Sequence, residues 1–376
     1  MTTKERALHW LLLAALILLA AEQFADALIE HAHAPMLDLA VYRSAAENGP
    51  LIRSPHGPMY FTYHPIMRHF FQALGAQFDL KLLTVYTLLT LLYGATIRAR
   101  PGAALATFLG LAIGGLGIAA ITTGNITPFL QLAILGLAAR GFDAPRDRWT
   151  FLAAVAVTAI VKPYMIAYVL LPLGVAMARR QPLRPHMIAA AATIGAVVVL
   201  IALYAVVRPD ETAIFIRNLT TQTLAQGDLG IAAYGRLAGQ LGSAGALIAH
   251  ALIVLTAATI TIGSAWRQGR LADPGFVLLL FFLAAILNPR LQDYDLFPAL
   301  TALILYLLGA QAGWRATVVL LIAFVAGGVA LHGARFADVE AGFWSNARNV
   351  YLVATALLVA GLVTLPRSPQ SPAARP

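Results

Sequence analysis

Residues 149–178 read WTFLAAVAVTAIVKPYMIAYVLLPLGVAMA, a stretch of thirty residues with a single charged side chain, Lys162. A soluble globular protein carries about 25% charged residues and does not tolerate so long an apolar run on its surface. The whole chain follows the same pattern, because 60% of its 376 residues are hydrophobic and only 11% are charged. Since about 20 apolar helical residues cross a bilayer, the sequence predicts a polytopic, all-α integral membrane protein.

Apolar stretches with short polar breaks between them predict about 10–12 transmembrane helices in one domain over residues 1–365. The expected spans are 8–29, 81–97, 102–121, 125–140, 149–161, 163–178, 186–207, 244–265, 274–288, 293–310, 315–331 and 346–365. Small residues near Ala25 leave a cleaved signal peptide as an alternative for the first span. The apolar run continues to Ile29 and many spans follow, so a retained signal anchor is favoured.

The charge pattern sets the orientation. Pro163 interrupts helical hydrogen bonding, so residues 149–178 form either two half-length helices or one kinked span. Only two helices keep Arg148 and Arg179 on one side, where every short loop is basic, as cytoplasmic loops are. We expect both termini in the cytoplasm, the protein in the cell (inner) membrane, and a disordered cytoplasmic tail at 366–376, which is rich in Pro, Ser and Ala.

The opposite, extracytoplasmic face has two long loops, at about 30–80 and 208–243, in which we expect short helices. It also holds thirteen of the 17 carboxylates. Acidic residues contribute little to orientation, so a function is the better explanation for them. The basic residues, which give a net charge of +9, form no continuous run, and this favours contact with membrane lipids and not with nucleic acid.

The first outer loop contains the strongest candidate for chemistry. Leu37 to Arg43 is amphipathic and predicts a short interfacial helix, on which Asp38 and Tyr42 share a face. Asp38 is either a general base that accepts a proton from an attacking hydroxyl or the cap of that helix. His31 and His33 are two residues apart and would point away from each other on a helix, so no metal site is expected there. The absence of cysteine excludes thiolate ligands and nucleophiles.

Other polar islands lie at predicted outer helix ends. Lys162 either holds a phosphate or extends to the membrane surface. Tyr63 and His64 belong either to an interfacial aromatic belt or to a sugar or lipid groove. The residues from Asn288 to Asp295 form a dense polar turn, which favours ligand binding over an internal salt bridge. There Arg290 could bind a phosphate, and Asp293 or Asp295 sugar hydroxyls. Loop residues Asn218 and Gln222 suit sugar contacts or simple solvation.

Taken together, these islands resemble glycosyltransferase family 87, which comprises polyprenyl-phosphate-sugar-dependent membrane enzymes of the GT-C fold. The resembling elements are Asp38 to Tyr42, Tyr63-His64-Pro65, Thr123-Gly124-Asn125, Val161-Lys162-Pro163-Tyr164, Asn218 to Leu224 and Asn288 to Asp295. They occur in the family's order and span about 8–365 of the chain. The chain departs from the family pattern where His64 replaces a first proline and where Asp293-Tyr294 replaces a His-Tyr pair.

The resemblance implies an inverting hexosyltransferase without a metal or other cofactor, with mannose as one candidate sugar. Asp38 would be the base at the extracytoplasmic face, and the donor would be a polyprenyl-phosphate sugar. The acceptor would be a glycan or glycolipid. Donor or substrate contacts are expected from Tyr42, Tyr63, His64, Asn125, Lys162, Asn218, Gln222, Arg290, Asp293 and Tyr294. The alternative function is a polytopic transporter or a flippase for lipid-linked sugars, which also uses broken helices. The absence of an internal repeat and the gathering of charge at one face favour the enzyme.

Overall fold

The structure is a computed structural model that describes residues 3–31, 37–48, 51–54, 57–60, 63–97, 102–115, 117–220, 232–288, 293–309 and 314–336. Within these ranges the chain is helical apart from one antiparallel hairpin, β1 paired with β2. The elements, with η for a 3-10 helix, are α1 (Thr3–His31), α2 (Leu37–Asn48), β1 (Leu51–Ser54), β2 (Gly57–Tyr60), α3 (Pro65–Leu74), α4 (Phe78–Thr96), α5 (Ala103–Ala112), η1 (Ile113–Gly115), α6 (Ile118–Thr123), α7 (Ile126–Ala139), α8 (Pro145–Val161), η2 (Pro163–Val169), α9 (Leu170–Ala178), α10 (Arg184–Val207), α11 (Pro209–Thr220), α12 (Ala232–Arg267), α13 (Phe276–Ile286), α14 (Asp293–Gly309) and α15 (Trp314–Phe336).

Helices lie at each of the predicted spans up to residue 331, and the last predicted span, 346–365, falls outside the described residues. Among the described helices, four are long and apolar enough to cross a membrane. These are Thr3–Ile29, Phe78–Thr96, Arg184–Val207 and Leu247–Arg267. The positions of the helices are therefore confirmed, and the number of crossings stays a prediction.

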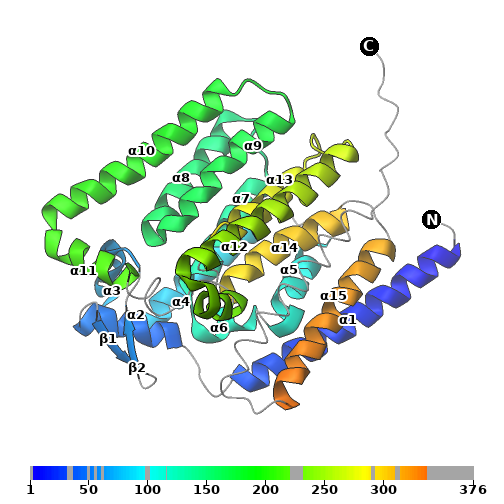
Figure 1. Ribbon diagram of the computed structural model, residues 1–376, viewed down its shortest axis with the longest axis horizontal. Coiled ribbons are helices and arrows are strands. Elements are labelled where there is room, and N and C mark those ends of the chain that lie inside the picture. Colours follow the sequence, from blue (N-terminus) through cyan, green and yellow to red (C-terminus); the bar gives the residue numbers. More distant parts are fainter. Residues whose placement is uncertain are drawn as a thin grey trace.

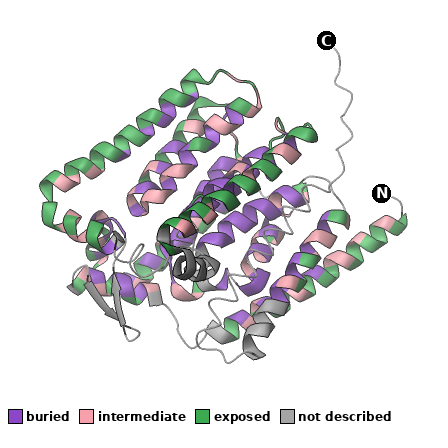
Figure 2. Cartoon of the chain, in the orientation of Figure 1, coloured by how far each residue is buried: buried purple, intermediate pink, exposed green. Residues whose placement is uncertain are grey.

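The distribution of buried residues shows which helices form the core (Figure 2). Nearly all of α7 and α13 is buried, whereas α10 and α12 present apolar side chains outward. Val206 on α10 is 79% exposed and Leu255 on α12 is 62% exposed. A continuous outer surface of this kind is unfavourable in water and favourable in lipid. The chain is thus a helical membrane protein.

The break at Lys162 reverses the chain. Helix α8 ends at Val161 and η2 begins at Pro163, with Lys162 extended between them. Arg179, directly after α9, donates from Nη1 to both carboxylate oxygens of Asp143, directly before α8, at 2.7 and 2.9 Å. The start of α8 and the end of α9 therefore lie at the same end of the bundle. This confirms the prediction of two half-length helices in this segment.

Close helix contacts depend on small residues and on one buried amide. A Cβ added to Gly110 of α5 would lie 2.3 Å from Thr301 Oγ1 of α14, so these two helices approach closely here. Gln23 of α1 is fully buried, donates from Nε2 to the Phe324 carbonyl of α15 at 2.6 Å, and accepts from the Gly114 N–H at 2.9 Å. One side chain thereby joins α1, η1 and α15.

The short elements α2, α3, α11 and the hairpin gather at one end of the bundle (Figure 1). The predicted helix from Leu37 is confirmed and extends to Asn48. The segment at about 208–243 was expected to be a loop that contains short helices; α11 fills 209–220, and α12 begins at Ala232, ahead of the span predicted from residue 244. Acidic residues in the first turn of α11, Asp210 and Glu211, stabilise its positive dipole end. Helix α12 continues through a kink at Gly242, where φ is 73°.

Candidate functional site

Asp38 lies in the first turn of α2, one residue inside the helix. Its carboxylate Oδ2 accepts a hydrogen bond from Asn125 Nδ2 at 3.1 Å, across 87 residues of sequence. The Thr123 hydroxyl, from the end of α6, also bonds to this carboxylate. Asp38 is therefore tied to the α6–α7 junction, a tertiary role that a simple helix cap would not require.

The orientation of the Asn125 amide follows from its neighbours. Asn125 is the N-cap of α7, and its Oδ1 accepts from the Thr127 N–H at 2.9 Å. A backbone N–H can only donate, so the atom that faces it is the oxygen and the NH₂ group faces Asp38. The positive φ of Gly124, 69°, allows the tight turn from α6 into this cap. Asn125 is buried, so this geometry is shielded from water.

Two buried tyrosines continue the hydrogen-bonded chain. The Tyr63 hydroxyl donates to Asn125 Oδ1 at 3.2 Å and lies 2.6 Å from the Tyr42 hydroxyl. Because Tyr63 has one proton and gives it to Asn125, Tyr42 donates to Tyr63. The Tyr42 oxygen in turn accepts from the Ile126 N–H at 3.3 Å. A directed chain thus runs from the start of α7 through both phenols to the Asn125 amide, whose NH₂ holds Asp38.

Lys162 brings a positive charge to this group. Its ammonium lies 4.0 Å from the centroid of the Tyr63 ring, in cation–π geometry. Its charge also acts on the Asp38 carboxylate. The backbone of Lys162 is extended at the α8–η2 break. A cation and a carboxylate from opposite ends of the first half of the sequence therefore belong to one group of interacting side chains.

The start of α14 adds a second carboxylate. Tyr164, two residues after Lys162, donates from its hydroxyl to Asp295 Oδ1 at 3.0 Å. Asp295 is only 3% exposed, and its charge acts on Tyr63. The sequence offered Asp295, with Asp293, as a possible partner of sugar hydroxyls, but the contacts made by Tyr164 and Thr123 were not predicted. Their positions inside the resembling motifs were the available signal.

Burial controls the protonation of these groups. It raises the pKa of the Asp38 carboxyl above its ordinary value of 3.8, while the hydrogen bonds from Thr123 and Asn125 and the charge of Lys162 act in the opposite direction. Burial, reinforced by nearby negative charge, also raises the pKa of the Tyr63 phenol. Tyr63 therefore stays a neutral donor, and Asp38 is a stronger base than an exposed aspartate.

The chain was compared with protein-family models, curated proteins and solved structures. None of them matches. The chemistry of the site itself is therefore the basis on which a function can be inferred.

The remaining predicted residues lie away from the group around Asp38 or outside the described residues. The His64 ring packs edge-on against Tyr204 and Phe215, with centroids 5.1 and 5.5 Å away, and burial lowers its pKa. It therefore contacts α10 and α11, whereas its neighbour Tyr63 contacts Asn125. Asn218 is buried in the last turn of α11. Gln222 and Arg290 lie outside the described residues, as do the side chains of the two residues that begin α14, Asp293 and Tyr294.

No group of three or more His, Asp or Glu side chains that could hold a metal ion occurs within the described ranges. The chemistry available from the described residues is that of a base, a cation and aligned hydroxyl and amide donors.

Proposed function

We propose that this chain is a membrane glycosyltransferase of the GT-C type, related to glycosyltransferase family 87. It would transfer a hexose, with mannose as a candidate, from a polyprenyl-phosphate sugar to a glycan or glycolipid acceptor. The observation that carries the proposal is the convergence of Asp38, Asn125, Tyr63 and Lys162 from four separate segments. In the proposed topology of 10–12 spans, this site lies at the extracytoplasmic face.

The proposed reaction is a single displacement with inversion at the anomeric carbon. The acceptor hydroxyl gives its proton to the Asp38 carboxylate as its oxygen forms a bond to the anomeric carbon. The bond from that carbon to the phosphate oxygen breaks, and its electron pair leaves with the polyprenyl phosphate. The negative charge on the departing phosphate is balanced by the Lys162 ammonium, with Arg290 as a further candidate.

The hydrogen-bond chain supports a base that must hold its position. The Asn125 amide is fixed at both ends, because Oδ1 accepts from Thr127 and Tyr63 while Nδ2 donates to Asp38. A carboxylate held in this way loses little freedom when an acceptor hydroxyl arrives. Its raised pKa gives the carboxylate a greater affinity for the transferred proton.

The test is transfer of radiolabelled sugar from polyprenyl-phosphate donors in membranes that contain wild type or Asp38→Asn. Asparagine cannot accept the proton, so we expect transfer to fall by at least a hundredfold, in the usual range for loss of a general base, ~10²–10⁴. Asp147→Asn is the matched control, because Asp147 also lies in the first turn of a helix, α8, and pairs with Arg140 at 3.5 Å. The control should transfer at the wild-type rate.

Unchanged transfer by Asp38→Asn would refute the mechanism. If purified wild type in liposomes moves a solute or a lipid-linked sugar across the bilayer and transfers no sugar, the transporter or flippase replaces the proposal.

A further inference from the structure

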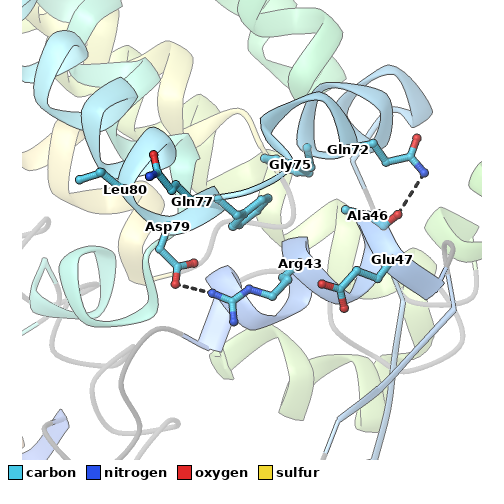
Figure 3. A pocket seen from close by; sticks show the side chains of 10 residues that line it. Arg43, Ala46, Glu47, Gln72, Gly75, Gln77, Asp79 and Leu80 are labelled. Carbon is cyan, nitrogen blue, oxygen red and sulfur yellow. Dashed lines mark hydrogen bonds and ion pairs between the residues drawn. The ribbon is translucent and has the colours of Figure 1, made fainter.

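An open hollow of about 670 Å³ lies between α2, α3 and the start of α4 (Figure 3). Its volume falls within the range of ligand pockets, ~300–1,000 Å³. Its lining includes Arg43, Glu47, Phe71, Gln72, Gln77 and Asp79. None of them belongs to the group around Asp38.

The polar wall of the hollow is already partly organised. Arg43 donates to Asp79 and so joins α2 to α4. Both side chains remain about half exposed, at 48% and 47%. Gln72 donates from Nε2 to the Ala46 carbonyl at 3.0 Å. Glu47 and Gln77 are exposed at the rim. The hollow therefore offers both donors and acceptors on planar groups, of which Arg43, Asp79 and Gln72 are held by hydrogen bonds.

The charges of the wall indicate what it binds. Its charged side chains are one arginine and two carboxylates, and the arginine is already paired with one of them. A phosphate or other anion would meet the second carboxylate, Glu47, without a cation to balance it. A neutral polyhydroxylated ligand avoids this cost, because each hydroxyl can both donate to a carboxylate and accept from an amide.

The hollow adjoins the Asp38 site through one aromatic layer. Phe71, in its floor, stacks on Tyr42 with ring centroids 4.6 Å apart and planes inclined by 12°. Arg43 and Glu47 also stand on α2, the helix that carries Asp38. Arg43 follows Asp38 by five positions, which corresponds to roughly 7.5 Å along the helix and about 140° around it.

We propose that this hollow binds the neutral saccharide part of the acceptor. The assignment rests on the proposed glycosyl transfer, for which it supplies the acceptor's binding surface. A saccharide seated between α2 and α4 would lie across the buried Tyr42–Phe71 layer from Asp38, so the hollow would hold a part of the acceptor that is remote from the reacting hydroxyl.

Gln77 offers a test that spares the fold. It has a left-handed backbone with φ of 64°, so Gln77→Gly removes a lining side chain and relieves strain. Arg180 is the other non-glycine residue with positive φ, 55°, among the described residues. It lies in the turn after α9, so Arg180→Gly is the matched control. Glu47→Ala is a second variant, since Glu47 is exposed.

Binding is measured first, without any dependence on transfer. Titration of the Asp38→Asn protein with mannotriose should show saturable binding, weakened at least threefold by Gln77→Gly and tenfold by Glu47→Ala. Arg180→Gly should leave it unchanged. Mannose 6-phosphate, the anionic probe, should bind more weakly than mannotriose. Tighter binding of the anion, or equal affinities in all variants, would overturn the assignment.

Kinetics separate this assignment from the proposed function. With Asp38 intact, the same two substitutions should raise the KM for the acceptor by these factors, with kcat and the KM for the donor unchanged. Transfer that depends on Asp38 but has an unaltered acceptor KM in both variants would overturn the hollow's role alone. Weakened mannotriose binding in a protein that transfers no sugar would support a saccharide site and refute the glycosyltransferase.

Discussion

Replacement of Gln23 by methionine should destabilise the membrane domain without altering its outer surface. The methionine side chain is unbranched and about as long as that of glutamine, but it has no hydrogen-bond donor and only a weak acceptor. The bonds to the Phe324 carbonyl and the Gly114 N–H are therefore both lost. Bonds between helices in membranes contribute on average about 0.6 and at most about 1.7 kcal/mol each. Two such bonds give an expected loss of about 1–3 kcal/mol in the free energy of unfolding.

The space around Gln23 supports this range. A Cβ on Gly328 would lie 3.0 Å from Gln23 Nε2, so the side chain sits in a tight gap between helices. The neighbouring groups therefore cannot easily move to find other partners, and water has no room to replace the amide.

The measurement is equilibrium unfolding in detergent micelles, followed by tryptophan fluorescence. Leu18→Met is the control, because Leu18 lies on the same helix and is 71% exposed. The control should stay within about 0.5 kcal/mol of wild type, as surface changes do. If Gln23→Met is as stable as Leu18→Met, the amide does not hold the three segments together and this reasoning is wrong.

Three further predictions follow from the packing and the charges. Asn125→Asp keeps the α7 cap but replaces the NH₂ donor with a second carboxylate, which raises the pKa of Asp38. As the pH is lowered, the rate of transfer by this variant should therefore fall at a higher pH than that of wild type. Asn125→Ala removes the cap as well and should lose about 1 kcal/mol of stability. Gly136→Ala should lower the free energy of unfolding in detergent by about 1–3 kcal/mol, because the added Cβ would lie 2.1 Å from a threonine oxygen of α4. Gly94→Ala is the control and should not lower it, because an added Cβ there would have no atom within 4 Å. Glu211 is partly desolvated, yet hydrogen bonding and nearby basic groups lower its pKa. Its carboxylate therefore stabilises the fold at neutral pH, and this contribution is lost as the pH falls through the lowered pKa. On acidification, the Tm of Glu211→Gln should drop less than that of wild type.

The helices could be predicted because lipid imposes a simple rule on sequence. A segment that crosses or packs within a membrane must satisfy its own backbone, so long apolar runs become helices and polar breaks mark their ends. The break at Lys162-Pro163 was predictable for a similar reason, since proline interrupts the helix and the arginines on either side must share a face.

Elements at the bundle end were harder to predict. Short helices were expected in the loop at about 208–243, but the bounds of α11 and the start of α12 at Ala232 were not predicted, because this segment is polar and shorter than a membrane span. Packing of α11 against α3 and its N-cap, through contacts such as His64 with Phe215, supplies the stability that local sequence does not reveal. The short hairpin at 51–60 gave no strong alternating pattern and was missed.

The sequence by itself indicated a helical membrane protein and drew attention to Asp38, Tyr63 and Lys162, whereas Asn125 was named only through the family resemblance. Composition is sufficient for the membrane assignment, and the cost of charge in lipid makes Lys162 conspicuous. Only the tertiary structure decided which of these residues meet. Their contacts join segments as far apart as residues 38 and 125, or 164 and 295, and such contacts depend on how helices pack against one another. No local pattern fixes that packing, since it is the sum of many small contacts spread over the whole bundle.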